Sequence, residues 1–81
     1  MQLSRAVKLR LKRLLKQNNM SEYNLSIQAG ISPSIINDFF RGKVTYIRLD
    51  NLLHICEGLN ITLKEFFDDS VFEEVKAENK K

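Results

Sequence analysis

The chain has 81 residues, of which 43% are hydrophobic and 28% are charged. This length excludes two full domains and the large enzyme folds, because a barrel or a doubly wound sheet needs about 200–250 residues. Cys56 is the only cysteine, so neither an intrachain disulfide nor a cysteine-based zinc site can form. We therefore expect one compact core in a reducing, cytoplasmic setting.

The net charge of +3 is distributed unevenly along the chain. Residues 1–48 contain nine lysines and arginines against two acids, whereas residues 49–81 contain four lysines against eight acids. This division indicates one surface directed at a polyanion and another kept away from it, although solvated helix faces would give the same composition. No apolar run approaches the roughly 18 residues that span a bilayer, and the basic N-terminus lacks the apolar region of a signal peptide.

Apolar residues at helical spacing predict a first helix over about residues 4–17. Its expected apolar face consists of Leu3, Val7, Leu11, Leu14 and Leu15. Its expected solvated face consists of Arg5, Lys12, Arg13 and Lys16, with Leu9 as an exposed leucine among them.

Two short helices are predicted next, separated by a glycine. Ser21 is a suitable N-cap for a helix over about residues 22–29, which Gly30 ends. Ser32 and Pro33 begin the following helix, because serine caps helices and proline is tolerated at the first helical position. That helix reaches about Arg41 and is ended by Gly42. Its apolar face consists of Ile35, Ile36, Phe39 and Phe40, and its other face of Pro33, Ser34, Asn37, Asp38 and Arg41.

A loop over residues 43–47 precedes a fourth helix over about residues 49–59, and Thr62-x-x-Glu65 is a capping box that opens a fifth. Ser70-x-x-Glu73 has the same pattern, so a short helix can follow from Val71, and we expect residues 77–81 to fray. The predicted fold is all-α, with a domain over residues 1–69 and an acidic extension over 70–81. Its core is expected to include Leu11, Leu15, Leu25, Ile36, Phe40, Leu52, Ile55, Leu59 and Phe66.

The segment from Leu25 to Lys43, LSIQAGISPSIINDFFRGK, has the pattern of a helix-turn-helix motif. In this motif a tight turn crosses two helices steeply, so that the second protrudes and can enter a DNA major groove about 12 Å wide. A glycine turn alone is a weak signal. Here the glycine turn lies in the basic half of the chain, and the number of helices predicted before and after it is the number that a helix-turn-helix domain has.

The sequence resembles the phage-repressor helix-turn-helix family, also called the lambda repressor/Cro-like or XRE family, over about residues 5–68. The resemblance implies five helices, of which the second and third form the motif, and DNA binding by the third. The residues that carry it are Met20-Ser21, Leu25, Ala29-Gly30-Ile31-Ser32, Ile36, Arg41-Gly42-Lys43, Leu52, Ile55, Leu59-Asn60-Ile61 and Leu63-Lys64-Glu65-Phe66-Phe67.

Four positions stand out against the family pattern. Members usually have a buried ion pair between an arginine late in the first helix and a glutamate late in the third, where this chain has Leu15 and Phe40. Replacing both partners by apolar groups can be neutral or stabilising, so the double change supports the alignment. Members often begin the second helix with a glutamine that contacts phosphate, and here Glu22 would repel phosphate unless it points away. Asp38 could accept a hydrogen bond from cytosine N4 or weaken DNA binding.

Carried over residue by residue, the resemblance assigns contacts with base edges to Pro33, Ser34, Asn37 and Asp38. It assigns contacts with phosphates to Ser32, Arg41, Lys43, Thr45 and Tyr46, together with the start of the second helix. The alternative for Ser34 and Asn37 is ordinary solvent-facing polarity, and for Arg41 and Lys43 a favourable charge at a helix C-terminus. The basic residues of the first helix are expected to face away from DNA and to add only a long-range field.

Other chemistry has little support in the sequence. His54 has no cluster of metal ligands around it and is expected on the surface. Cys56 lies on an apolar stripe, so we interpret it as a buried, inert thiol and not as a redox sensor. The acids Asp68, Asp69, Glu73 and Glu74 are interpreted as solvating charges instead of a metal site. No nucleophile–base pair or phosphate-binding glycine loop is present, so no enzymatic activity, cofactor, metal or small-molecule ligand is expected.

The resulting hypothesis is a sequence-specific DNA-binding transcriptional regulator of bacterial or phage type, a repressor that binds a palindromic operator as a homodimer. The alternative is a protein-interaction or antitoxin-like module on the same fold. Dimerisation is expected through the acidic C-terminal half, where four large apolar residues lie within seven positions: Phe66, Phe67, Val71 and Phe72. Packing of Phe66 and Phe72 back onto the core, with Phe67 partly exposed, is the equal alternative.

Overall fold

The computed structural model describes residues 1–77, which contain five α-helices, one 3-10 helix and no strand. The all-α prediction is therefore confirmed for this part of the chain, and the fraying expected at the C-terminus lies, apart from Ala77, outside the described residues. The helices are α1 (Leu3–Gln17), α2 (Glu22–Ala29), α3 (Pro33–Phe40), α4 (Leu49–Gly58) and α5 (Leu63–Phe67), followed by the 3-10 helix η1 (Ser70–Glu74).

The first four helices all end in the same way. A residue with positive φ follows each of them: Asn19 and Asn60 at 51° and 59°, Gly30 and Gly42 at 70° and 79°. Paired backbone bonds then close each end, as where Ile31 N–H donates to the Ser26 carbonyl at 3.1 Å. Gly30 and Gly42 adopt a left-handed backbone conformation that residues with a side chain rarely adopt. The helix ends that the sequence predicted at these two glycines are confirmed.

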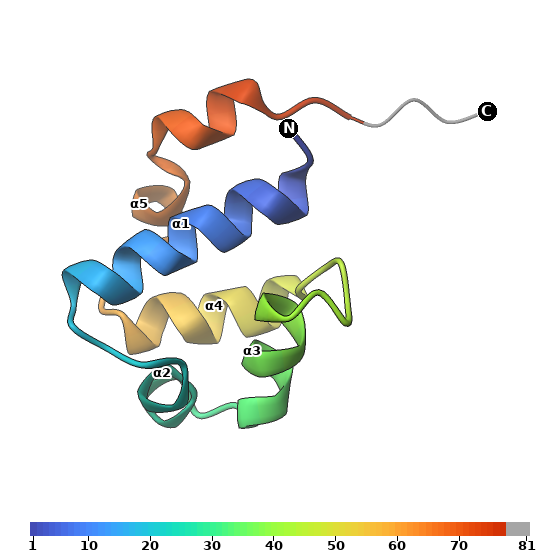
Figure 1. The fold of residues 1–81 in the computed structure, drawn as a ribbon. Helices are drawn as coiled ribbons and strands as arrows, with labels where there is room; N and C mark the ends of the chain where they lie inside the picture. The colour runs from blue at the N-terminus through green and yellow to red at the C-terminus, as the bar shows by residue number, and fades with distance from the viewer. Residues whose placement is uncertain (78–81) are drawn as a thin grey trace.

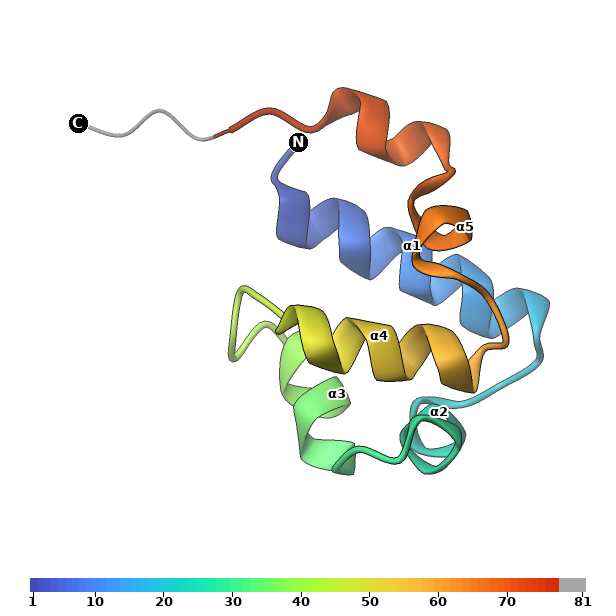
Figure 2. The same ribbon diagram turned by 180° about the vertical axis from the view of Figure 1, so that it is seen from behind.

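α1 lies between η1 and α4 in both views of the fold, and α2 and α3 lie on the opposite side of α4 (Figures 1 and 2). The core forms where these helices meet. All nine predicted core residues are buried, and Leu15 and Phe40 belong to the same buried cluster, 8% and 9% exposed. The two apolar residues therefore occupy the interior, where the resemblance places an ion pair.

Gly58, at the end of α4, sets the spacing between α4 and α2. A Cβ atom added to Gly58 would lie 2.8 Å from the backbone nitrogen of Ala29, which is too close for any real contact. The missing side chain therefore lets α4 approach the backbone of α2 directly. This contact holds the first helix of the helix-turn-helix against the core.

The chain after α5 differs in detail from the prediction. The cap of the last helix is Asp69 and not Ser70, because the Asp69 carboxylate accepts a 2.8 Å hydrogen bond from the Val71 backbone N–H. The segment is a single 3-10 helix, with Val71 buried against the rest of the fold. The division into residues 1–69 and 70–81 stays a prediction.

Two leucines of α1 also differ from expectation. Leu3, the first residue of α1, is 55% exposed. Leu9, expected among solvated charges, is half-buried and lines a shallow groove beside the end of α3.

Candidate nucleic-acid interface

The helix-turn-helix is built by capping at both of its helices. The Ser21 hydroxyl accepts from Asn24 N–H at 3.0 Å and begins α2, and the Ser32 hydroxyl accepts from Ser34 N–H at 3.4 Å and begins α3. Pro33 occupies the first turn of α3, where its missing N–H costs nothing. α2 and α3 run in clearly different directions on either side of the turn at Gly30 (Figure 1).

α3 separates into a buried and an open face. At 100° per residue, the residues expected to face DNA occupy an arc of about 140°, and the buried side chains of α3 lie opposite. Ile36 and Phe39 are 1% and 2% exposed on the inner face. The outer face consists of Pro33, Ser34, Asn37, Asp38 and Arg41. Asp38 is half-buried, and the other four residues are exposed.

Not all outer polar groups are equally available. The hydroxyls of Ser32 and Ser34 lie 2.9 Å apart and hydrogen bond to each other, and the Ser32 hydroxyl also caps α3. Asn37 is exposed and makes no side-chain hydrogen bond within residues 1–77. Its amide can both donate and accept, which is the property that adenine N6 and N7 require.

Glu22 is paired instead of free. Its carboxylate lies 3.4 Å from Nη1 of Arg41, so the start of α2 and the end of α3 are joined by an ion pair on the surface. Both side chains keep substantial exposure, at 36% and 60%. Such a surface pair contributes about 0–1 kcal/mol and can exchange for another partner. The repulsion of phosphate expected from Glu22 is therefore offset by its own neighbour.

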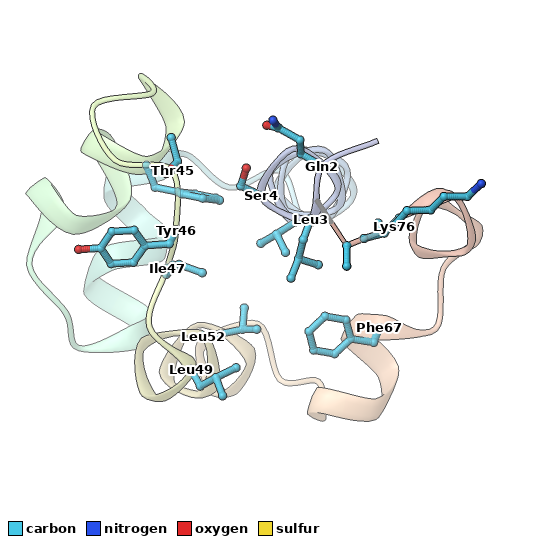
Figure 3. A pocket seen from close by; sticks show the side chains of 14 residues that line it. Gln2, Leu3, Ser4, Thr45, Tyr46, Ile47, Leu49, Leu52, Phe67 and Lys76 are labelled. Atoms are coloured by element: carbon cyan, nitrogen blue, oxygen red, sulfur yellow. The ribbon is translucent and has the colours of Figure 1, made fainter. Parts of the chain in front are cut away.

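The loop after α3 carries the remaining residues assigned to phosphate contacts. Lys43, Thr45 and Tyr46 are all exposed, and Tyr46 reaches 68%. The Tyr46 hydroxyl points away from the nearby groove (Figure 3). All nine residues predicted to contact DNA thus come from α3, its N-cap and its following loop, and their roles stay predictions.

An apolar groove of about 770 Å³ opens beside this loop, between the start of α1, the start of α4 and α5. Leu3, Leu52 and Phe67 point into it from three different helices (Figure 3). Leu49, at its edge, is 77% exposed. Leu3 and Leu49 were not expected at a surface groove, because helical spacing placed Leu3 in the core and made Leu49 only the first residue of a helix.

The other residues singled out in the sequence have no site around them. Cys56 is fully buried, and burial raises the pKa of its thiol, which keeps it in the less reactive protonated form. His54 is exposed on α4, 3.9 Å from Glu57. Within residues 1–77 no group of three or more His, Cys, Asp and Glu side chains could hold a metal ion. No helix in the same range is long and apolar enough to cross a membrane.

In residues 1–77, five α-helices around one core, with an exposed third helix behind a glycine turn, define a helix-turn-helix DNA-binding domain. The family model for the Cro/C1-type HTH DNA-binding domain matches residues 10–70, about three quarters of the chain. The chain therefore belongs to this family, as its resemblance to the phage repressors implied. Searches of curated proteins and of solved structures gave no match. Family membership supports a DNA-binding regulator in general.

Proposed function

We propose that the protein is a sequence-specific transcriptional repressor that acts in the cytoplasm and reads a palindromic operator with α3. The observation that carries this proposal is the open face of α3, where Asn37 is exposed and unpaired within the described residues. An α-helix with its side chains is about 10–12 Å across, which suits a major groove about 12 Å wide. Lys43, three residues after the end of α3, is an exposed cation without an ion pair in residues 1–77.

The proposal assigns two kinds of contact to neighbouring residues. Asn37 reads a base edge, whereas Lys43 neutralises a phosphate and positions the helix without reading sequence. The two substitutions Asn37→Ala and Lys43→Ala should therefore differ in kind. Asn37→Ala should cost about 1–3 kcal/mol and relax preference at one base position. Lys43→Ala should weaken binding to all sequences alike and reduce the slope of log K against log salt by about 1.

Selection of bound sequences from random duplex DNA, followed by titration of both variants on the selected site, tests this assignment. Unchanged binding by both variants would show that α3 is not the reading element. If the binding of the parent chain to duplex DNA did not depend on salt, the protein-interaction module would be favoured instead. Neutralisation of DNA phosphates by cations always produces a dependence on salt.

The proposed regulator binds as a homodimer, because one helix offers few base contacts and a palindrome presents two half-sites. Leu3, Leu49 and Phe67 are 55%, 77% and 39% exposed around the apolar groove, which is a costly surface for a monomer to leave in water. A second copy can cover the same patch twice in a symmetric pair.

The role expected of Phe72 in this interface is not supported. Its ring lies 5.9 Å from the ring of Phe66 and packs half-buried against the core, so Phe72→Asp would damage folding. Phe67→Asp and Leu49→Asp are the better tests of the dimer. Sedimentation without DNA should show a dimer for the parent chain and a folded monomer for either variant. Ile27→Asp, on the exposed side of α2, is the control that should stay dimeric.

A further inference from the structure

The six basic residues of α1 fall into two groups that the structure separates. Arg10 and Arg13 both bond to Asp69, at 3.4 and 3.1 Å. Within residues 1–77 the remaining four form no ion pair, and they lie within an arc of about 80° of the helix. These four unpaired cations are Arg5, Lys8, Lys12 and Lys16.

Three of these cations line a groove together with the loop that follows α3. Arg5, Lys8 and Lys12 form one wall of this groove, which has a volume of about 310 Å³, and Gly42, Val44 and Thr45 contribute to the other. Phe39 lies between the walls, with the Lys8 ammonium 5.7 Å from the centre of its ring. No acidic side chain is among the described residues that line the groove.

The sequence predicted that the cations of α1 face away from DNA, and the groove gives a reason to propose the opposite for three of them. Thr45 and its neighbour Lys43 belong to the loop assigned to phosphate contacts, and Thr45 itself lines the groove with Arg5 and Lys12. A polyanion held by the loop would therefore run beside the cations of α1. From Arg5 to Lys16 the strip extends about 16 Å along the helix axis, long enough for more than one phosphate.

We propose that this strip of α1, formed by Arg5, Lys8, Lys12 and Lys16, is a second phosphate-binding surface that continues the backbone contacts of the loop after α3. The inference rests on the proposed DNA binding and extends it beyond the helix-turn-helix. Because phosphates carry no sequence information, the strip adds affinity equally to operator and non-operator DNA. It also gives a role to a row of cations that forms no ion pair within residues 1–77, whereas Arg10 and Arg13 are bonded to Asp69.

The test compares two double variants that change the net charge by the same amount. Arg5→Gln with Lys12→Gln removes two cations of the strip, and Lys64→Gln with Lys76→Gln removes two exposed cations from α5 and the chain after η1. All four side chains are exposed, so thermal melting should show that both variants keep the parent's stability. A third variant, Arg5→Lys with Lys12→Arg, keeps both charges on the strip.

If each cation neutralises one phosphate, the strip variant should lower the slope of log K against log salt by about 1.8. Between 50 and 200 mM salt this corresponds to about a twelvefold smaller loss of affinity than the parent shows. The same change should appear on operator and non-operator duplexes. The control double variant and the charge-preserving variant should both keep the parent's slope.

Equal slopes for the strip variant and the control variant would overturn the inference, because the effect would then reflect net charge alone. If Lys43→Ala lowers the slope but the strip variant does not, the inference fails and the proposed function stands. If the parent chain shows no salt-dependent binding to duplex DNA, both fail together.

Discussion

Arg10 and Asp69 are 59 positions apart in the sequence and are joined through Nη1 and Oδ2 at 3.4 Å. The Arg10 guanidinium also donates to the carbonyls of Glu65 and Phe66, at 2.9 and 2.8 Å, and so satisfies the end of α5. Asp69 in turn accepts from the Val71 backbone N–H and begins η1. One pair of side chains therefore ties α1 to both C-terminal elements.

The first prediction concerns Asp69 and pH. The hydrogen bond from Val71 N–H, together with the guanidinium groups of Arg13 and Arg10, holds the pKa of the Asp69 carboxyl below its ordinary value. A lowered pKa in the folded state stabilises the fold above the unfolded pKa of about 4, and this stabilisation disappears as pH falls through the folded pKa. Asp69→Asn should therefore lower the free energy of unfolding by about 1–2 kcal/mol at pH 7.

Chemical denaturation at several pH values measures this difference, which should shrink below about pH 4 as the parent's own carboxyl becomes protonated. Asp50→Asn is the exposed comparison, because the Asp50 carboxylate pairs with Arg48 in an open position, and it should lower the free energy of unfolding less than Asp69→Asn does. A gap between parent and Asp69→Asn that stays constant at low pH would contradict the assigned role of the charge.

The second prediction concerns the apolar replacement of an ion pair. Leu15→Arg alone buries a charge without a partner at a position that is 8% exposed, and should destabilise the fold by about 3–5 kcal/mol. Adding Phe40→Glu should recover part of this loss, because the resemblance places the opposite charge there. Thermal unfolding checks both variants, with Lys16→Arg on the exposed side of α1 as control. A parent-like melting temperature for Leu15→Arg would refute the buried placement.

The third prediction concerns the contact between α4 and α2. In most helices glycine to alanine is favourable by about 1 kcal/mol, but at Gly58 the new Cβ would press on the backbone of Ala29. We expect Gly58→Ala to destabilise the fold by about 1–3 kcal/mol through overpacking. Denaturant unfolding measures it, and Glu57→Ala, at the exposed neighbouring position, should change stability far less. Increased stability in Gly58→Ala would show that α2 can shift without cost.

The fourth prediction concerns the ion pair between Glu22 and Arg41. Glu22→Gln removes a negative charge from the start of α2 and releases Arg41, while the loss of this surface pair should cost less than about 1 kcal/mol in stability. If Arg41 then binds one phosphate, the slope of log K against log salt should steepen by about 0.9. Glu57→Gln makes the same charge change on α4 and should not alter the slope. Weaker binding by Glu22→Gln would mean that the pair itself positions α3.

Local patterns in the sequence determined the five α-helices, the caps at Ser21, Ser32 and Thr62, and most of the buried side chains. Spacing placed Leu25 and Ile36 inside, and Gly30 and Gly42 marked the turns, because caps and left-handed glycines depend on a few neighbouring residues. The same reasoning identified the helix-turn-helix and its outer face. These features needed no knowledge of which helix packs against which.

Tertiary structure decided everything that depends on distant neighbours. Helical spacing could not show that Arg10 turns inward to cap α5 while Arg5 and Lys12 stay unpaired, because the partner, Asp69, arrives from the other end of the chain. It could not reveal that Gly58 meets the backbone of Ala29, or that Glu22 is neutralised by Arg41. A periodic pattern specifies which side of a helix is apolar, whereas the identity of the group on the facing helix follows only from the packing.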